Sequence, residues 1–424
     1  MKANELKEKL VQGALSEYKN IYEKPEHQAE RIIKAIDAFE SKYGAGRDIS
    51  VFSVPGRSEI SGNHTDHNGG VVLAAAISRD IIAVAAKNTD GIIRVCSERY
   101  SEDIVEISQT DNPDNFKKFT SEALIGGVVN GFVEGGYGVG GFDAYTDSEV
   151  MEGGGVSSSA AFEVMMGNIL NHLYNGGGVP NVEIAEFAKT SENRYFGKPC
   201  GLMDQAACAI GGLIFMDFED KEKTHIEPID FSLSDAGYSL CIVNTGASHS
   251  DLNEDYSLIP EEMCAVAKLL GRETLRGLAK EDIIKNINNI RRLAGDRAIL
   301  RSLHFINENE RVLRIKEHLK NNDVDAFLKE ISQSGKSSFE YLQNIYSPKK
   351  PKEQPIALAL ALTDDYFNNR SAAYRVHGGG FAGTVQAFVK NTEVSGYAKY
   401  MNSVFGKKSV LILDIRPLGA IKLF

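Results

Sequence analysis

The chain has 424 residues, 42% of them hydrophobic and 25% charged, a composition typical of a globular protein of about two domains. Its formal net charge of −11 and pI near 5.4 make nucleic acid a poor partner. No apolar run is long enough to span a membrane, and the N-terminus is not a signal peptide. We therefore expect a cytoplasmic protein with no membrane association, either a monomer or a weak dimer.

Apolar periodicity predicts a helical lead-in of two helices over residues 1–43. The further elements expected in chain order are strands at 49–56 and 71–98, helices at 115–136, after 159 and at 182–197, strands at 211–218 and 238–246, mostly helix over 260–346, and a final helix followed by a strand at 409–415. Helices and strands alternate without a fixed period, so we expect no repeat architecture. A soft domain boundary is expected near residues 220–240.

A glycine-rich segment, GGGVSSSAA at residues 153–161, precedes an apolar stretch with helical spacing. Its glycines lack Cβ atoms, so a phosphate can approach the backbone, and the first N–H groups of the helix point toward such an anion. Its serines add hydroxyls that can cap the helix, donate to phosphate or bind magnesium. The segment predicts a phosphate-binding loop, although taken alone it fits equally a glycine turn with a serine N-cap.

A second glycine-rich segment is HGGGFAGT, residues 377–384. We expect it where a strand turns into a helix, so that its backbone approaches a phosphate or packs against the first loop. On its own, the pattern also fits a tight turn between two elements.

Residues 55–70, PGRSEISGNHTDHNGG, gather polar side chains beside strand-like sequence. The members of this cluster are Arg57, Glu59, Asn63, His64, Asp66 and His67. Their side chains can converge on a polyhydroxylated ligand, although such a segment can also be a solvated turn. His64, Asp66 and His67 are also possible metal ligands, but no supporting set of ligands accompanies them at a suitable spacing.

Two carboxylates stand in SENRYFGKPCGLMDQ, residues 191–205. Glu192 offers the hard oxygen ligands that magnesium prefers. Asp204 can accept a hydroxyl proton, or it can cap the helix that follows.

These four segments, in this order, resemble motifs of the sugar and small-metabolite kinases, a family that includes galactokinase, homoserine kinase, mevalonate kinase and phosphomevalonate kinase. GRSEISGNHTDH resembles the galactokinase signature G-R-x-N-L-I-G-E-H-T-D-Y, and GGGVSSSA resembles the phosphate loop G-x-G-L-S-S-S-A. CGLMDQ resembles C-G-I-M-D-Q, and GGGFAGT resembles G-A-G-F-G-G. The resemblance implies a two-domain α+β fold, with an N-terminal domain at 1–230, a C-terminal domain at 231–424, and ATP and sugar bound in the cleft between them.

The resemblance also implies an enzyme that uses ATP and Mg²⁺ to phosphorylate the anomeric 1-hydroxyl of galactose or a closely related sugar. Arg57 would stabilise charge on the transferring phosphoryl group, and Asp204 would act as the base or orient the hydroxyl. The other site residues that it implies are Gly153, Gly154, Gly155, Val156, Ser157, Ser158 and Ser159 for ATP, Ser159 and Glu192 for magnesium, and Asn63, His64, Asp66, Gly201 and Tyr256 for the sugar.

Departures from the family pattern bear on the substrate. The family's glutamate in G-E-H-T-D, which accepts a hydrogen bond from the 6-hydroxyl in galactokinases, is Asn63 here, and the tyrosine after the aspartate is His67. The lost charge is worth about 1–2 kcal/mol in a buried site, which is too little to abolish galactose binding. Because repulsion of a C6 carboxylate is also lost, galacturonate stays open as an alternative substrate.

Other departures concern the nucleotide and a second class of function. The arginine pair expected shortly after Tyr256 is absent, and a basic residue expected before His249 is Ser248. Residues from Asp251 to Glu262 have calcium-loop spacing, but Tyr256 takes the turn position that needs glycine. A galactokinase-like sensor that binds sugar and ATP without turnover is an alternative, and the intact Ser157-to-Ala161 segment favours the enzyme.

Overall fold

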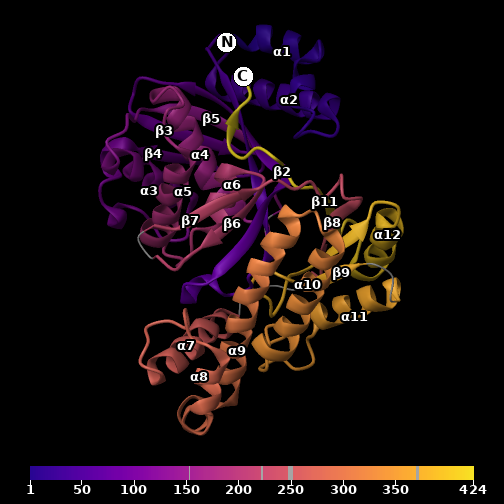
Figure 1. Ribbon diagram of the computed structural model, residues 1–424. Helices are drawn as coiled ribbons and strands as arrows, with labels where there is room; N and C mark the ends of the chain where they lie inside the picture. Colours follow the sequence, from indigo (N-terminus) through magenta and orange to yellow (C-terminus); the bar gives the residue numbers. More distant parts are fainter. Residues whose placement is uncertain (152, 221–222, 247–251, 369–371) are drawn as a thin grey trace.

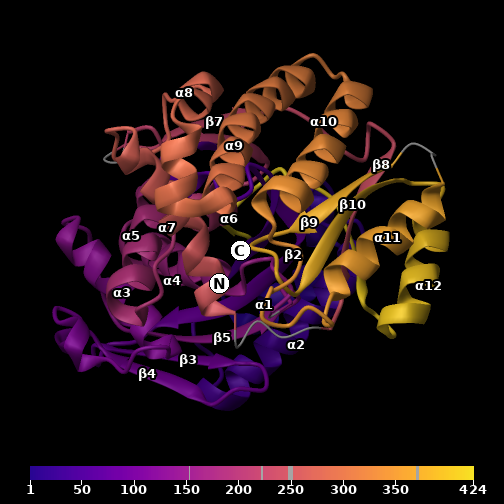
Figure 2. The same cartoon turned by 90° about the horizontal axis from the view of Figure 1, so that it is seen from below.

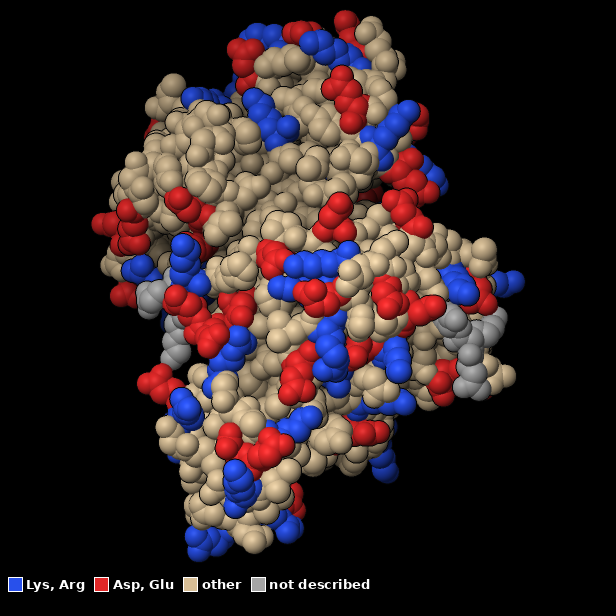
Figure 3. All heavy atoms as spheres, viewed as in Figure 1, with Lys and Arg blue, Asp and Glu red and all other residues tan. Residues whose placement is uncertain are grey.

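The computed structural model of the chain describes residues 1–151, 153–220, 223–246, 252–368 and 372–424 (Figure 1). Ser248 and Asp251 lie outside these described residues. Among the described helices, none is long and apolar enough to cross a membrane. On the face shown in Figure 3, acidic and basic side chains are interspersed over the lower half of the view.

The larger sheet has eight strands in the described residues. They are β1 (Ser50–Ser61), β2 (Val71–Lys87), β3 (Ile92–Ser97), β4 (Glu102–Glu106), β5 (Phe142–Ser148), β6 (Leu213–Asp217), β7 (His225–Ile229) and β12 (Ile421–Lys422). Their order is β12-β1-β2-β5-β3-β4, with β6 paired to β2 and β7 paired to β6. All pairs are antiparallel except β3 with β5.

Strand β2 is buried on both faces, which explains its nearly continuous apolar sequence. Successive side chains of a strand point to opposite faces, so β2 contributes side chains to two hydrophobic cores. Ile82 and Val84 pack with the lead-in helices α1 (Ala3–Val11) and α2 (Pro25–Tyr43). Ile81 and Ala83 belong to the main core on the opposite face. The helical lead-in therefore covers one face of the sheet.

Four helices cover the other face of this sheet (Figure 1). They are α3 (Ser121–Glu134), α4 (Ser158–Tyr174), α5 (Asn181–Thr190) and α6 (Met203–Ile210). Helix α4 begins directly after the segment predicted as a phosphate loop and packs on β1 and β2. Its start therefore faces strand β1, which carries Arg57.

The smaller sheet is antiparallel with the order β11-β8-β10-β9. Its strands are β8 (Tyr238–Asn244), β9 (Ala373–His377), β10 (Thr384–Lys390) and β11 (Val410–Leu413). The helices of this half are α7 (Asn253–Leu269), α8 (Lys280–Lys285), α9 (Ile287–Lys320), α10 (Val324–Ser337), α11 (Pro355–Phe367) and α12 (Val394–Phe405). Helix α10 packs on β9, whereas α11 and α12 contact β10 and β8 respectively (Figure 2).

The expected strand-to-helix transition at residues 377–384 is wrong. The segment connects β9 to β10 in an antiparallel hairpin in which Thr384 pairs with His377. The residues after it, VQAFVK, are almost all buried and include β-branched and aromatic side chains, a composition that favours a strand between two neighbours.

The end of the chain returns to the larger sheet. In β12, Ile421 pairs with Ser53 and Lys422 with Phe52 of β1, so both termini lie near the lead-in helices (Figure 1). The mixed helices and sheets confirm the predicted α+β class, and the boundary near residue 230 stays a prediction.

Candidate active site

Arg57 and Asp204 are brought together from strand β1 and the first turn of helix α6. The Nε of Arg57 donates to Oδ1 of Asp204 at 2.7 Å, and its Nη2 donates to Oδ2 at 2.8 Å. The β1–β2 pairing shifts register on both sides of Arg57, between Pro55 and Arg57 and between Glu59 and Ser61. Such irregularities re-aim side chains, and here the result is a two-point ion pair.

The two charges of this pair stabilise each other. Burial by itself would raise the pKa of Asp204, but the Arg57 guanidinium and hydrogen bonds from Arg57 and Ser157 hold it below the ordinary value. The Ser157 hydroxyl donates to Oδ2 of Asp204 at 2.5 Å. Asp204 is therefore an ionised carboxylate that faces both Arg57 and the glycine-serine segment.

The predicted phosphate loop, residues 153–159, has the backbone shape of an anion cradle. Gly153, Gly155 and Ser157 all have positive φ, at 68°, 69° and 57°. Within the described residues, the first-turn amides of Ser158 and Ser159 donate no hydrogen bond to the protein. Unpaired amides at a helix start are the groups that bind phosphate.

Close backbone contacts join this loop to its neighbours. A β-carbon at Gly56 would lie 2.7 Å from the carbonyl oxygen of Val156, so β1 approaches the loop closely. The N–H of Arg57 donates to the same oxygen at 3.1 Å, and Nη1 of Arg57 donates to the carbonyl of Gly155. Arg57 therefore contacts the loop through backbone and side chain.

His377 lies beside Gly155 of the phosphate loop and was missed by the sequence reasoning. Its Nε2 is 3.0 Å from the Ser58 hydroxyl and its Nδ1 is 2.9 Å from the Thr384 hydroxyl. A β-carbon at Gly155 would lie 3.1 Å from both His377 Nδ1 and Thr384 Oγ1. Burial, together with Arg57 and Arg375, lowers the pKa of His377 to about 3, so the imidazole is neutral.

The two residues predicted to bind magnesium also meet. The Ser159 hydroxyl donates to Oε1 of Glu192 at 3.3 Å. The same oxygen accepts from the Lys198 ammonium at 3.0 Å, and Oε2 accepts from the Gln205 amide at 2.8 Å. Among the described residues, no group of three or more His, Cys, Asp or Glu side chains could hold a metal.

Glu163, four residues after Ser159 on α4, completes this cluster. Its Oε2 accepts from the Gln205 amide at 3.1 Å, so one amide donates to both Glu163 and Glu192. In the described structure, Oε1 of Glu163 and Oε1 of Gln205 are buried acceptors without a partner. Burial and the nearby Glu192 raise the pKa of Glu163 well above its ordinary value. A hydroxyl, a carboxylate and spare oxygen acceptors are a donor set that fits Mg²⁺.

Two of the predicted sugar-binding residues lie side by side. A β-carbon at Gly201 would lie 2.8 Å from Oδ2 of Asp66, so glycine lets the backbone before α6 approach that carboxylate. Gly201 precedes Asp204 by three residues, so Asp66 lies close in the fold to the segment that carries the partner of Arg57.

The other three predicted sugar-binding residues contact the loop at residues 378–383, called here the glycine loop. The amide of Asn63 donates to the Gly378 carbonyl at 2.7 Å. The His64 imidazole is bonded to the Gly379 carbonyl at 2.8 Å, and the Tyr256 hydroxyl donates to the Gly380 carbonyl at 2.7 Å. These side chains therefore hold the glycine loop in addition to any role toward a sugar.

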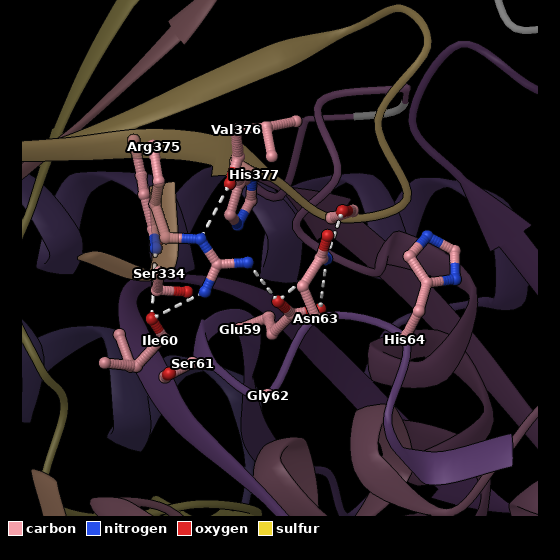
Figure 4. Close-up of polar contacts among 12 residues, drawn as sticks. Glu59, Ile60, Ser61, Gly62, Asn63, His64, Ser334, Arg375, Val376 and His377 are labelled. Carbon is pink, nitrogen blue, oxygen red and sulfur yellow. Dashed lines mark hydrogen bonds and ion pairs between the residues drawn. The ribbon is translucent and has the colours of Figure 1, made fainter. Parts of the chain in front are cut away.

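Glu59 belongs to the predicted polar cluster at residues 55–70, although the sequence assigned it no role of its own. Its carboxylate accepts from Nη2 of Arg375 at 2.6 Å and from the Asn63 amide at 3.1 Å, and all three side chains are buried (Figure 4). A signal was present, because the family pattern G-R-x-N has asparagine where this chain has Glu59.

Family models match two parts of the chain. The model described as "GHMP kinases N terminal domain" matches residues 123–212, which include the phosphate loop, Glu192 and Asp204. The model described as "Galactokinase galactose-binding signature" matches residues 37–87, which include Arg57 and Asn63.

Whole-chain comparisons agree with these models. A galactokinase of Streptomyces coelicolor is 30% identical over 390 residues, covering 90% of this chain and 95% of that protein. A galactokinase of Bacillus subtilis is 27% identical over 394 residues, with 89% and 94% covered. The structure of Lactococcus lactis galactokinase complexed with galactose matches with a TM-score of 0.77 at 21% identity, covering 92% of this chain and 100% of that one. Mevalonate kinase of Methanococcus jannaschii matches with a TM-score of 0.60 at 15% identity, with 88% and 99% covered. The chain therefore belongs to the galactokinase family of small-molecule kinases.

Proposed function

We propose that this chain transfers the γ-phosphoryl group of ATP to the anomeric 1-hydroxyl of galactose or a closely related sugar, giving the sugar 1-phosphate and ADP. The observation that carries the proposal is the Arg57–Asp204 pair beside the phosphate loop. Galactokinases that match almost the full length of the chain support the choice of sugar.

The phosphate loop binds the ATP phosphates through the backbone of residues 153–159. The free amides at the start of α4 and the positive end of its dipole offset the phosphate charge. This local field matters because the protein as a whole carries a net charge of −11.

Arg57 and Asp204 act on the two partners of the transfer. Phosphoryl transfer passes through a loose transition state, so catalysis depends mainly on positioning and charge stabilisation. Arg57 stabilises the phosphoryl group, and Asp204 orients the sugar hydroxyl through its carboxylate. The lowered pKa of Asp204 makes it a weak base, which favours this orienting role and late acceptance of the proton.

Ser159 and Glu192 hold Mg²⁺ in this proposal. When bound, the ion would neutralise negative charge on the phosphates of ATP. Phosphate oxygens and water molecules would supply its remaining ligands. Lys198 and Gln205 each bond to Glu192 and fix the orientation of its carboxylate.

The surroundings of residue 63 favour a neutral group at C6 of the sugar. The Asn63 amide faces two hydrogen-bond acceptors, namely the Glu59 carboxylate and the carbonyl of Gly378. Arg375 is already paired with Glu59. A C6 carboxylate would face these acceptors without gaining from Arg375, whose charge Glu59 already balances, so we place galactose before galacturonate.

An assay of ADP release tests the proposal against both alternatives. With ATP, Mg²⁺ and a panel of galactose, galacturonate, N-acetylgalactosamine, fucose and arabinose, we expect the highest kcat/KM for galactose. A higher kcat/KM for galacturonate would reverse the order of substrates. Binding of galactose and ATP without ADP release would instead support a non-catalytic sensor.

A further inference from the structure

Two departures from the family pattern are in contact with each other. The pattern G-R-x-N-L-I-G-E has asparagine and glutamate four residues apart, where this chain has Glu59 and Asn63. The carboxylate and the amide have therefore changed places. In the structure they touch, because Nδ2 of Asn63 donates to Oε1 of Glu59 at 3.1 Å. We treat the two departures as one pair, because their side chains bond to each other.

The amide of Asn63 has its two hydrogens engaged within the protein. Nδ2 donates to Glu59 and, at 2.7 Å, to the carbonyl of Gly378. Its Oδ1 accepts from the amide of Asn344 at 2.8 Å, and the side chain is fully buried. Residue 63 therefore works as a fixed link to the glycine loop.

Glu59 determines which way this amide faces. Arg375 donates to Glu59 at 2.6 Å, and the carbonyls of Ile60 and Val376 accept from the same guanidinium at 3.0 Å (Figure 4). The Glu59 carboxylate, held in place by Arg375, can only accept hydrogen bonds. It therefore selects the orientation of the Asn63 amide in which the NH₂ group faces Glu59. That orientation also points an N–H at the Gly378 carbonyl. A carboxylate at position 63 has no hydrogen to give to Gly378.

The glycine loop is followed and preceded by residues that contact the phosphate loop. His377 and Thr384 stand at its two ends, and both approach the position of Gly155. Fixing Gly378 from position 63 therefore helps to fix the wall against which the phosphate loop packs.

We propose that Glu59 and Asn63 form an exchanged positioning pair, in which the carboxylate on Arg375 orients the amide and the amide holds the glycine loop beside the phosphate loop. The link to nucleotide binding rests on the proposed function. The contacts themselves do not depend on the sugar.

The test uses variants of nearly unchanged shape, namely E59Q, N63D and the double variant E59Q/N63D. N63D loses the donor to Gly378 and sets two carboxylates against each other. We expect it to lower Tm by about 5 °C. The double variant restores a carboxylate–amide contact, so we expect it to recover at least half of that shift. Additive shifts in Tm, with no recovery in the double variant, would overturn the pairing.

Hydrogen exchange of the peptide that covers residues 378–383 measures directly how firmly Asn63 holds the glycine loop. We expect exchange about tenfold faster in N63D and also in the double variant, because both lack the amide at position 63. In E59Q the amide remains but loses the carboxylate that orients it, so exchange should rise by less than in N63D, about two- to fivefold over the wild type. KM for ATP should rise several-fold in the same two variants. Unchanged exchange in N63D would contradict the role of Asn63.

Glu106 and Gln109 provide a matched control, since they form a contacting carboxylate–amide pair at 3.1 Å that is exposed. E106Q, Q109E and their double variant should change neither Tm nor the exchange of the glycine loop. Should N63D fail to fold, N63A gives the same loss of the donor without a second carboxylate. If the wild type releases no ADP with galactose while the exchange pattern holds, the proposed function fails and the pair stands.

Discussion

The guanidinium of Arg57 and the carboxylate of Asp204 bond at two points, at 2.7 and 2.8 Å, although the residues are 147 positions apart in the sequence. The side chains of Arg57 and Asp204 are 9% and 26% exposed. Ser157 and the Gly155 carbonyl contact the same pair from the phosphate loop. The pair therefore joins the predicted sugar side of the site to the predicted nucleotide side.

Asp204→Asn should lower kcat for galactose phosphorylation by about 10²–10⁴-fold, because the amide neither balances Arg57 nor receives a proton. ADP release at saturating ATP and galactose measures this loss. Asp217→Asn is a matched control, since Asp217 pairs with Arg276 at 2.8 Å outside the site. If Asp204→Asn turns over as fast as Asp217→Asn, the role given to Asp204 is wrong.

Glu192→Gln should raise the Mg²⁺ concentration for half-maximal rate by about tenfold or more, because Glu192 is the charged ligand of the ion in the proposed site. A titration of the rate with Mg²⁺ at fixed ATP gives this value. Glu183→Gln, on the neighbouring α5 and bonded to Tyr137, should leave it unchanged. An unaltered Mg²⁺ requirement in Glu192→Gln would remove the residue from the metal site.

His377 should not add a proton-linked step to catalysis between pH 5 and 8. Its pKa lies near 3, since burial and the arginines Arg57 and Arg375 disfavour the charged ring. We therefore expect parallel pH profiles of kcat/KM for the wild type and for His377→Asn, with a raised KM for ATP in the variant. A wild-type inflection near pH 6.5 that is missing from His377→Asn would contradict the neutral imidazole.

Asp80 on β2 joins the lead-in helix α2 to the end of the chain through buried ion pairs. It accepts from Arg31 of α2 at 2.6 Å and from Arg416 near the chain's end at 3.1 Å, and all three side chains are buried. Asp80→Asn should lower the unfolding free energy by about 3–5 kcal/mol at pH 7, since the buried Arg416 loses its ion-pair partner and Arg31 keeps only its pairs with Asp147 and Glu149. Denaturant titrations of both proteins measure this difference.

The pH dependence of that difference follows from the pKa of Asp80. Burial alone would raise this pKa, but Arg31 and Arg416 lower it from 3.8 to about 2. The folded state then binds fewer protons than the unfolded state, so the stabilisation is complete above pH 3.8 and is lost as the pH falls toward 2. The difference between the wild type and Asp80→Asn should therefore shrink by about 2 kcal/mol between pH 4 and pH 2. A constant difference down to pH 2 would contradict the ion-pair origin.

The sequence predicted the parts of the site that are local in the chain. Glycine and serine spacing predicted a phosphate loop at residues 153–159, and the structure gives Gly153, Gly155 and Ser157 positive φ values that fit such a cradle. Arg57 and Asp204 were placed together only through the family resemblance, because no local pattern brings residues this distant into contact.

The features that the sequence did not predict depend on contacts between segments that are distant in the chain. His377 and Glu59 acquire their roles from Ser58 and Arg375, on strands far away in the chain. The segment after the glycine loop was expected to be helical because its strand identity depends on pairing with β8 and β9. The return of Ile421 to the first sheet has no local signal, since β12 has only two residues.

Identification of the product tests the central claim most directly. The wild type is incubated with ATP, Mg²⁺ and galactose, and the phosphorylated sugar is analysed by phosphorus NMR with its coupling to the sugar protons. We predict phosphate on the anomeric oxygen of galactose and an equal amount of ADP. Phosphate on another hydroxyl, or no phosphorylated sugar from a folded protein that binds ATP, would contradict it.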